Sequence, residues 1–134
     1  MKKFENYKNN LAVLEKADSQ DLSNEFIVGG VIDKFFIQFE LGWKVLKELL
    51  LYEGVAAANS GSPREIIKEA YKLYPCMDEG VWLSMLAQRN NMAHIYDASA
   101  AEALVQLILR DYIPAFQKLR DSISAKYGAL LETL

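Results

Sequence analysis

The sequence predicts an all-α protein, an up-and-down helical bundle of four main helices plus a short helix. Three observations support this. Apolar residues recur every three or four positions along most of the chain, which is the helical period. No run of residues alternates between apolar and polar with the two-residue period of a strand. The 134 residues are also the size of one ordinary domain, so we expect a single domain over residues 1–134.

The first two helices are expected over residues 2–17 and 25–53, joined by a polar connection at residues 18–24. The long second helix carries two apolar stripes, which indicate that it is central in the bundle or faces a second subunit. From the second stripe we predict a dimer. The first stripe is Ile32, Phe36, Phe39, Trp43, Leu46 and Leu50, and the second is Ile27, Val31, Phe35, Gly42, Val45 and Leu49.

A flexible loop is expected at residues 54–61, and a short helix then begins with a strong signal. Ser62 can cap that helix, Pro63 suits its first position, and Glu65 can complete a capping box. The helix should end near residue 73, because Pro75 disfavours its continuation.

Two further helices follow. Asp78 is expected to cap the fourth helix, which leads into the Arg89 segment. A capping box formed by Ser99 and Glu102 should open the last helix, and Pro114 should kink it by removing one backbone hydrogen bond.

The composition limits the possible functions. The net charge of −3 and the pI near 5.2 exclude a broad cationic surface, so any nucleic-acid chemistry must depend on a local cluster. The single cysteine, Cys76, allows no internal disulfide, which favours a reducing, cytoplasmic setting, and it has no partner for a metal site. We see no signal peptide and no apolar run long enough to cross a membrane.

His94 is the only histidine, so any imidazole chemistry at neutral pH must use it. The simplest interpretation is a partly buried histidine whose ring is hydrogen-bonded to a neighbouring residue and has no chemical role. However, Arg89, Asn90 and Tyr96 lie close to it in the sequence. A histidine can take the proton of a ribose 2′-hydroxyl while an arginine holds the phosphate, and this chemistry needs no metal and no cofactor.

The spacing of this segment does not suit a regular helix. Five residues advance about 7.5 Å and turn about 140° from the starting direction, so Arg89 and His94 would not share one helix face. A tightened last turn, or a site assembled from two subunits, would be needed to bring them together.

The Arg89-x4-His94-x-Tyr96 segment resembles the motif of HEPN toxins that are encoded beside a minimal nucleotidyltransferase. The resemblance extends over nearly the whole chain, to the nucleotidyltransferase substrate-binding branch of that superfamily. The elements of that branch occur in order as Phe39-Glu40-Leu41-Gly42-Trp43-Lys44 with Lys47, Ser62-Pro63-Arg64, and Trp82 before Arg89.

The resemblance implies a helical-bundle homodimer in which the two motif segments meet at a cleft between subunits. It implies a metal-independent ribonuclease in which Arg89 and His94 are catalytic and Asn90 supports them. It also implies a partner, the minimal nucleotidyltransferase acting as antitoxin, that attaches AMP to Tyr96 and silences the toxin. The alternative is a non-catalytic subunit that binds a nucleotide or another substrate for a nucleotidyltransferase, and a third option is a dimeric bundle that keeps the motif for structure only.

Three further residues are candidates for supporting or ligand contacts. Glu40 and Lys44 have the i,i+4 spacing of a surface ion pair and can also support the site. Arg64 lies at a helix start, where it can contact a phosphate.

Overall fold

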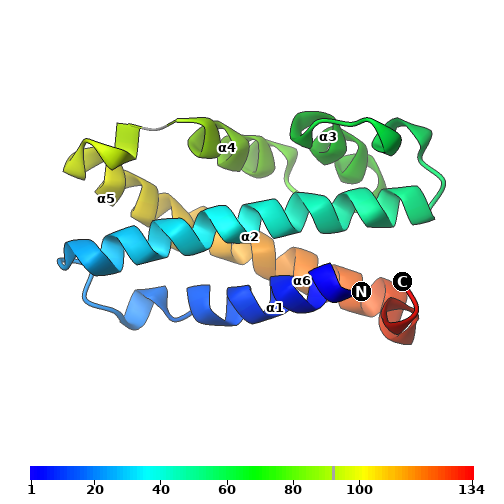
Figure 1. The fold of residues 1–134 in the computed structure, drawn as a ribbon, viewed down its shortest axis with the longest axis horizontal. Helices are drawn as coiled ribbons and strands as arrows, with labels where there is room; N and C mark the ends of the chain where they lie inside the picture. The colour runs from blue at the N-terminus through cyan, green and yellow to red at the C-terminus, as the bar shows by residue number, and fades with distance from the viewer. Residues whose placement is uncertain (92) are drawn as a thin grey trace.

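The computed structural model describes residues 1–91 and 93–134, and it is an all-α bundle, as predicted (Figure 1). The long helix α2 runs along the middle of the molecule, with α1 on one side of it, α3 and α4 on the other, and α5 and α6 behind. The helices are α1 (Lys2–Leu14), α2 (Glu25–Tyr52), α3 (Pro63–Leu73), α4 (Glu79–Asn90), α5 (Ala98–Leu107) and α6 (Ile113–Tyr127).

Helix α2 is the centre of the bundle, and both of its predicted apolar stripes are largely buried within this one chain. In the second stripe, Phe35, Val45 and Leu49 are fully buried, and Gly42 lies against a side chain of α1. This stripe is therefore not available to a second subunit, and the reason from which we predicted a dimer was wrong.

A buried polar cluster fixes α1 against α2 and α6. The Gln38 amide donates to the backbone carbonyl of Tyr7 (3.1 Å) and accepts from the Asn10 amide (2.8 Å). The Tyr7 hydroxyl donates to the carbonyl of Phe116 (2.8 Å). Burial raises the pKa of Tyr7 well above its ordinary value, because the phenolate would lose its hydration. The cluster leaves these buried polar groups satisfied, which is the condition for keeping them in a core.

Helix α4 is positioned by a close contact between Trp82 and Gly42. A side-chain carbon at position 42 would lie 3.1 Å from the Trp82 ring, so only glycine lets the two helices approach this closely. Trp82 is fully buried and packs edge-on against Phe116 at a centroid distance of 5.5 Å. Since Arg89 lies two turns further along α4, this contact determines where Arg89 stands above α2.

Most of the predicted helix starts are confirmed. Asn24 caps α2, Ser62 caps α3 by accepting from the Glu65 amide (3.3 Å), and Asp78 caps α4 by accepting from the Val81 amide (3.2 Å). The segment at residues 54–61, expected to be a loop, contains a short 3₁₀ turn, Ala56–Asn59.

The start of α5 differs from the prediction. Asp97, not Ser99, is the cap, and its carboxylate accepts from the amides of Ser99 (2.9 Å) and Ala100 (3.4 Å). The helix begins at Ala98 because an aspartate is already in the capping position.

A π-helical segment, Ile108–Tyr112, joins α5 directly to α6, and Pro114 lies in the first turn of α6, where its missing backbone N–H is tolerated. No helix among the described residues is both long and apolar enough to cross a membrane.

Candidate functional site

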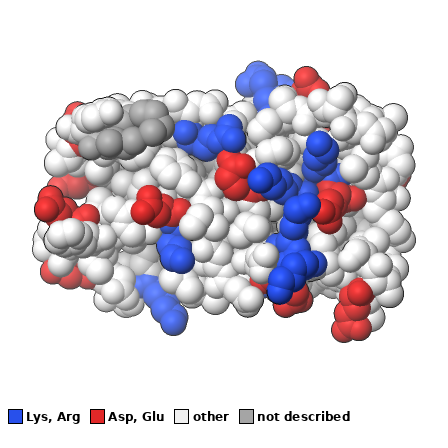
Figure 2. Space-filling view, viewed as in Figure 1, with Lys and Arg blue, Asp and Glu red and all other residues white. Residues whose placement is uncertain are grey.

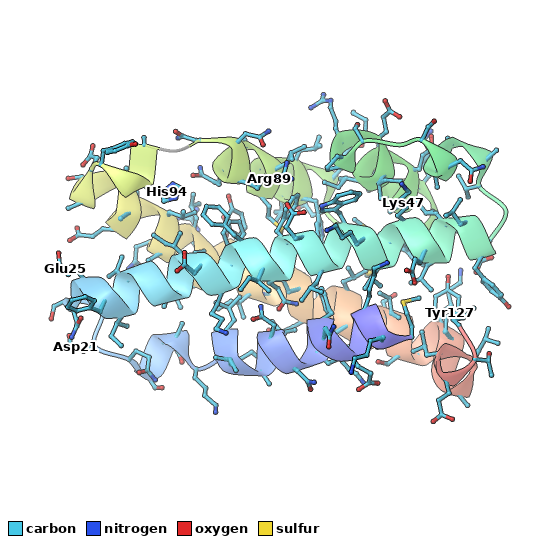
Figure 3. The ribbon with its side chains drawn as sticks, in the orientation of Figure 1. Asp21, Glu25, Lys47, Arg89, His94 and Tyr127 are labelled. Carbon is cyan, nitrogen blue, oxygen red and sulfur yellow. The ribbon has the colours of Figure 1, made fainter. Side chains whose placement is uncertain are left out.

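The motif segment is not one continuous helix. Helix α4 ends at Asn90, Asn91 has an extended backbone, and His94 lies in a separate 3₁₀ turn, Ala93–Ile95, before Asp97 caps α5. Arg89 and His94 therefore belong to different elements, and Figure 3 shows them on opposite sides of this break. Helix α4 ends before His94 and a tighter 3₁₀ turn follows, which is the kind of change that the motif spacing called for. Even so, the side chains of Arg89 and His94 are not in contact.

Arg89 is held by a carboxylate of α2. Its guanidinium lies 2.8 Å from one oxygen of Glu40, and the other oxygen accepts from the Trp43 indole (3.0 Å). A weaker contact joins Arg89 to the Asn90 side chain (3.4 Å). Glu40 thus contacts a candidate site residue, and the ion pair expected between Glu40 and Lys44 is not formed. The Arg89 side chain keeps 35% of its surface exposed, so an anion can still reach it.

His94 and Tyr96 line a groove with a volume of about 810 Å³. The His94 ring is half-buried and packs against Phe36 at a centroid distance of 5.2 Å, whereas Tyr96 is 88% exposed at the rim. The groove lies between the first half of α2, the 3₁₀ turn and the start of α5. Its other lining residues are Leu22, Ser23, Glu25, Val28, Gly29, Ile32, Asp33, Asp97, Ala98, Ala101 and Glu102.

The groove is acidic. Glu25, Asp33, Asp97 and Glu102 line it, and among the residues that the structure describes no lysine or arginine does. Arg89 is not part of the lining, because Glu40 holds it further along α2. Within one chain, a ligand in this groove therefore meets His94 and Tyr96 but no fixed positive charge.

The other two candidates stand apart from the motif. Lys44 is exposed, and its ammonium lies 5.9 Å from the centroid of the Trp43 ring. Arg64 is exposed in the first turn of α3, and among the described residues it makes no hydrogen bond or ion pair with Arg89 or His94. In residues 1–91 and 93–134, no cluster of His, Cys, Asp and Glu side chains is arranged to hold a metal ion.

Sequence reasoning missed the floor of the groove. Phe36 was assigned to an apolar core stripe of α2, yet it is half-buried and its ring packs against the ring of His94. Its helical spacing is the same as that of the core residues, so the pattern alone contained no signal that this position faces a site.

One protein family matches nearly the whole chain. The family is described as nucleotidyltransferase substrate binding protein like, and its model matches residues 2–125. The chain belongs to this family. The family is related to HEPN proteins, so the resemblance is supported at this coarser level. No curated protein matches the chain.

Proposed function

We propose that this protein binds a substrate for a separate nucleotidyltransferase, and that the groove beside His94 and Tyr96 is the ligand site. The observation that carries the proposal is the groove itself, in which two residues of the motif lie together in a chain of a substrate-binding family. At about 810 Å³ the groove is within the range of small-molecule sites, which is about 300–1,000 Å³.

The lining indicates what part of a ligand enters. Val28, Ile32 and Phe36 give an apolar floor on which a planar ring can lie. The carboxylates of Asp33 and Glu102 accept hydrogen bonds, so they suit hydroxyl and amino groups. A nucleoside or an amino sugar meets both requirements, whereas a phosphate buried among these carboxylates would be repelled. We therefore expect the phosphates of a nucleotide to point out of the groove.

Calorimetric titration with AMP, ATP and an amino sugar tests this role. We expect His94→Ala to weaken binding at least about tenfold, since the ring closes one wall of the groove. Lys118→Ala, on an exposed face outside the groove, is the matched control and should bind as the parent does. The proposal would be refuted if the protein bound none of these ligands. It would also be refuted if the protein did not bind a separately purified minimal nucleotidyltransferase.

The second candidate is a metal-independent ribonuclease, favoured by the intact Arg89-x4-His94-x-Tyr96 run and by the accessibility of Arg89. In this reaction His94 takes the proton of a ribose 2′-hydroxyl, and the 2′-oxygen then bonds to the adjacent phosphorus while the bond from phosphorus to the 5′-oxygen breaks. The departing 5′-oxygen takes up a proton from water, and Arg89, supported by Asn90, stabilises the charge on the phosphate. The partner would silence the enzyme by bonding the Tyr96 oxygen to the α-phosphorus of ATP, with release of pyrophosphate.

Incubation with total RNA and tRNA in excess EDTA separates the two candidates. Cleavage by the parent but not by His94→Ala supports the ribonuclease, because the variant removes the proposed base from a half-buried position and leaves the core intact. No cleavage by a parent sample whose intact mass includes no added AMP supports the binding subunit. Equal cleavage by both proteins would indicate a contaminating nuclease.

A further inference from the structure

The first half of α2 separates two grooves. One is the ligand groove beside His94, and the other, which we call the α1–α2 groove, lies between α2 and the end of α1. The residues of α2 that line each groove recur every three or four positions, and the two sets alternate, so the grooves lie on opposite sides of the helix. The set in the ligand groove is Glu25, Val28, Gly29, Ile32, Asp33 and Phe36, and the set in the α1–α2 groove is Phe26, Ile27, Gly30, Val31 and Lys34.

The α1–α2 groove is an apolar trough with a volume of about 310 Å³. Buried side chains, Leu14, Ala17 and Val31, form its floor. Its rims are accessible, because Phe26 is 84% exposed and Val13 is 47% exposed. The volume only reaches the lower limit of small-molecule sites, which is about 300 Å³. A trough between two helices with large apolar side chains at its rims suits the anchor residues of a protein segment better.

The charge at this groove is positive. Lys16 and Lys34 line it, and among the residues that the structure describes no aspartate or glutamate does. Neither lysine forms an ion pair within residues 1–91 and 93–134. Figure 2 shows the surface over the start of α2 as mostly uncharged, whereas acidic and basic side chains are interleaved over its second half. The complementary surface is therefore apolar, with carboxylates beside it.

Two adjacent glycines form a saddle between the grooves. Gly29 lines the ligand groove, Gly30 lines the α1–α2 groove, and both are exposed. A glycine inside a helix costs about 1 kcal/mol relative to alanine. Neither glycine has a positive φ, and among the described residues nothing lies within 4 Å of a side-chain carbon added at either. The conformation and packing of the chain itself give no reason for this cost, whereas the close approach of another molecule does.

We propose that the nucleotidyltransferase partner docks in the α1–α2 groove and crosses the saddle at Gly29 and Gly30 to reach the ligand. An apolar side chain of its docking segment enters the groove beside Phe26, and carboxylates of the same segment pair with Lys16 and Lys34. The partner thus approaches from the basic side of α2 and passes over the helix where no side chain stands in the way. This inference names the docking surface of that partner and rests on the proposed function.

Shape and charge favour a protein segment over other occupants. A flat lipid surface does not fill a trough between two helices, and a nucleic acid presents phosphates but no apolar anchor for the floor. A protein segment supplies both the anchor and the carboxylates. The orientation follows as well, because the carboxylates are attracted by Lys16 and Lys34 and repelled by the acidic ligand groove on the opposite side.

Calorimetric titration with a separately purified minimal nucleotidyltransferase tests the groove. We expect Phe26→Asp and Lys16→Glu each to weaken binding at least about tenfold, because one removes the apolar rim and the other reverses a charge. Phe26 is exposed in the first turn of α2, where an aspartate is favourable, so the fold is kept. Leu130→Asp and Lys118→Glu, at exposed positions outside both grooves, are the matched controls and should bind as the parent does.

Gly30→Gln tests the saddle without disturbing the fold. The space beside Gly30 is open and glutamine is the better helix residue, so the variant should be at least as stable as the parent by thermal denaturation. Gly30 does not line the ligand groove, so binding of ATP or an amino sugar without the enzyme should stay within about twofold of the parent. Affinity for the enzyme should fall at least about tenfold, because the added side chain stands where the segment crosses.

The outcomes separate this inference from the proposed function. Parent-like enzyme binding by Phe26→Asp, Lys16→Glu and Gly30→Gln would overturn the docking surface and leave the proposed function standing. Weaker ligand binding by Gly30→Gln without the enzyme would show that the glycine serves the ligand groove, and it would overturn the saddle. Failure of the parent itself to bind the enzyme would refute the proposed function.

Discussion

Replacing Gly42 by alanine should destabilise the protein, although alanine is normally the better helix residue. In an unhindered helix the exchange gains about 1 kcal/mol. Here the added carbon would lie 3.1 Å from Trp82 and 3.3 Å from Tyr7, and both side chains are fully buried. Overpacking of this kind costs about 1–3 kcal/mol, so we expect a net loss of about 1 kcal/mol.

Gly30→Ala is the matched control, since nothing lies within 4 Å of the added carbon. It should stabilise the protein by up to about 1 kcal/mol, which places the two variants about 2 kcal/mol apart. Urea denaturation at low protein concentration measures both free energies of unfolding, with unchanged m-values as the check on two-state behaviour. Equal free energies of unfolding for Gly42→Ala and Gly30→Ala would contradict this expectation.

Three further predictions concern single contacts. Ser62→Ala should cost about 1 kcal/mol of stability by thermal denaturation, because α3 loses its cap. A double-mutant cycle between Glu40 and Arg89 should give a coupling of at most about 1 kcal/mol, since both side chains are about one-third exposed; a larger value would mean a desolvated pair. Burial raises the pKa of Tyr74 and Tyr127, whose hydroxyls are hydrogen-bonded to each other, so the contribution of this pair to stability is complete below the unfolded pKa of about 10 and is lost progressively above it, because the unfolded chain releases protons that the folded chain keeps. Urea titrations from pH 8 to 11 should show this decline, and a flat profile would contradict it.

The helices could be predicted because their signals are local. The 3.6-residue period of the apolar positions and the caps Ser62 and Asp78 each act within a few residues. The start of α5 was misplaced because two capping residues, Asp97 and Ser99, lie two positions apart, and the pattern does not rank them.

The candidate site could be located only in part. The sequence marks Arg89, His94 and Tyr96 as neighbours along the chain, and His94 and Tyr96 do border one groove. It contains no signal that Glu40 holds Arg89 away from that groove, because this contact joins residues 49 positions apart and depends on the packing of α4 on α2.

The sequence by itself determined that the protein is helical, roughly where each helix lies, and which segment carries the chemistry-bearing side chains. Only the tertiary structure decided which face of α2 is covered, that the second apolar stripe serves the chain's own core, and that the groove at His94 is acidic. The physical reason is that periodicity and capping are properties of one segment, whereas burial, charge pairing and groove shape arise from segments that meet only after folding. Phe36 and Phe39 have the same pattern in the sequence, and one is floor of a groove while the other is core.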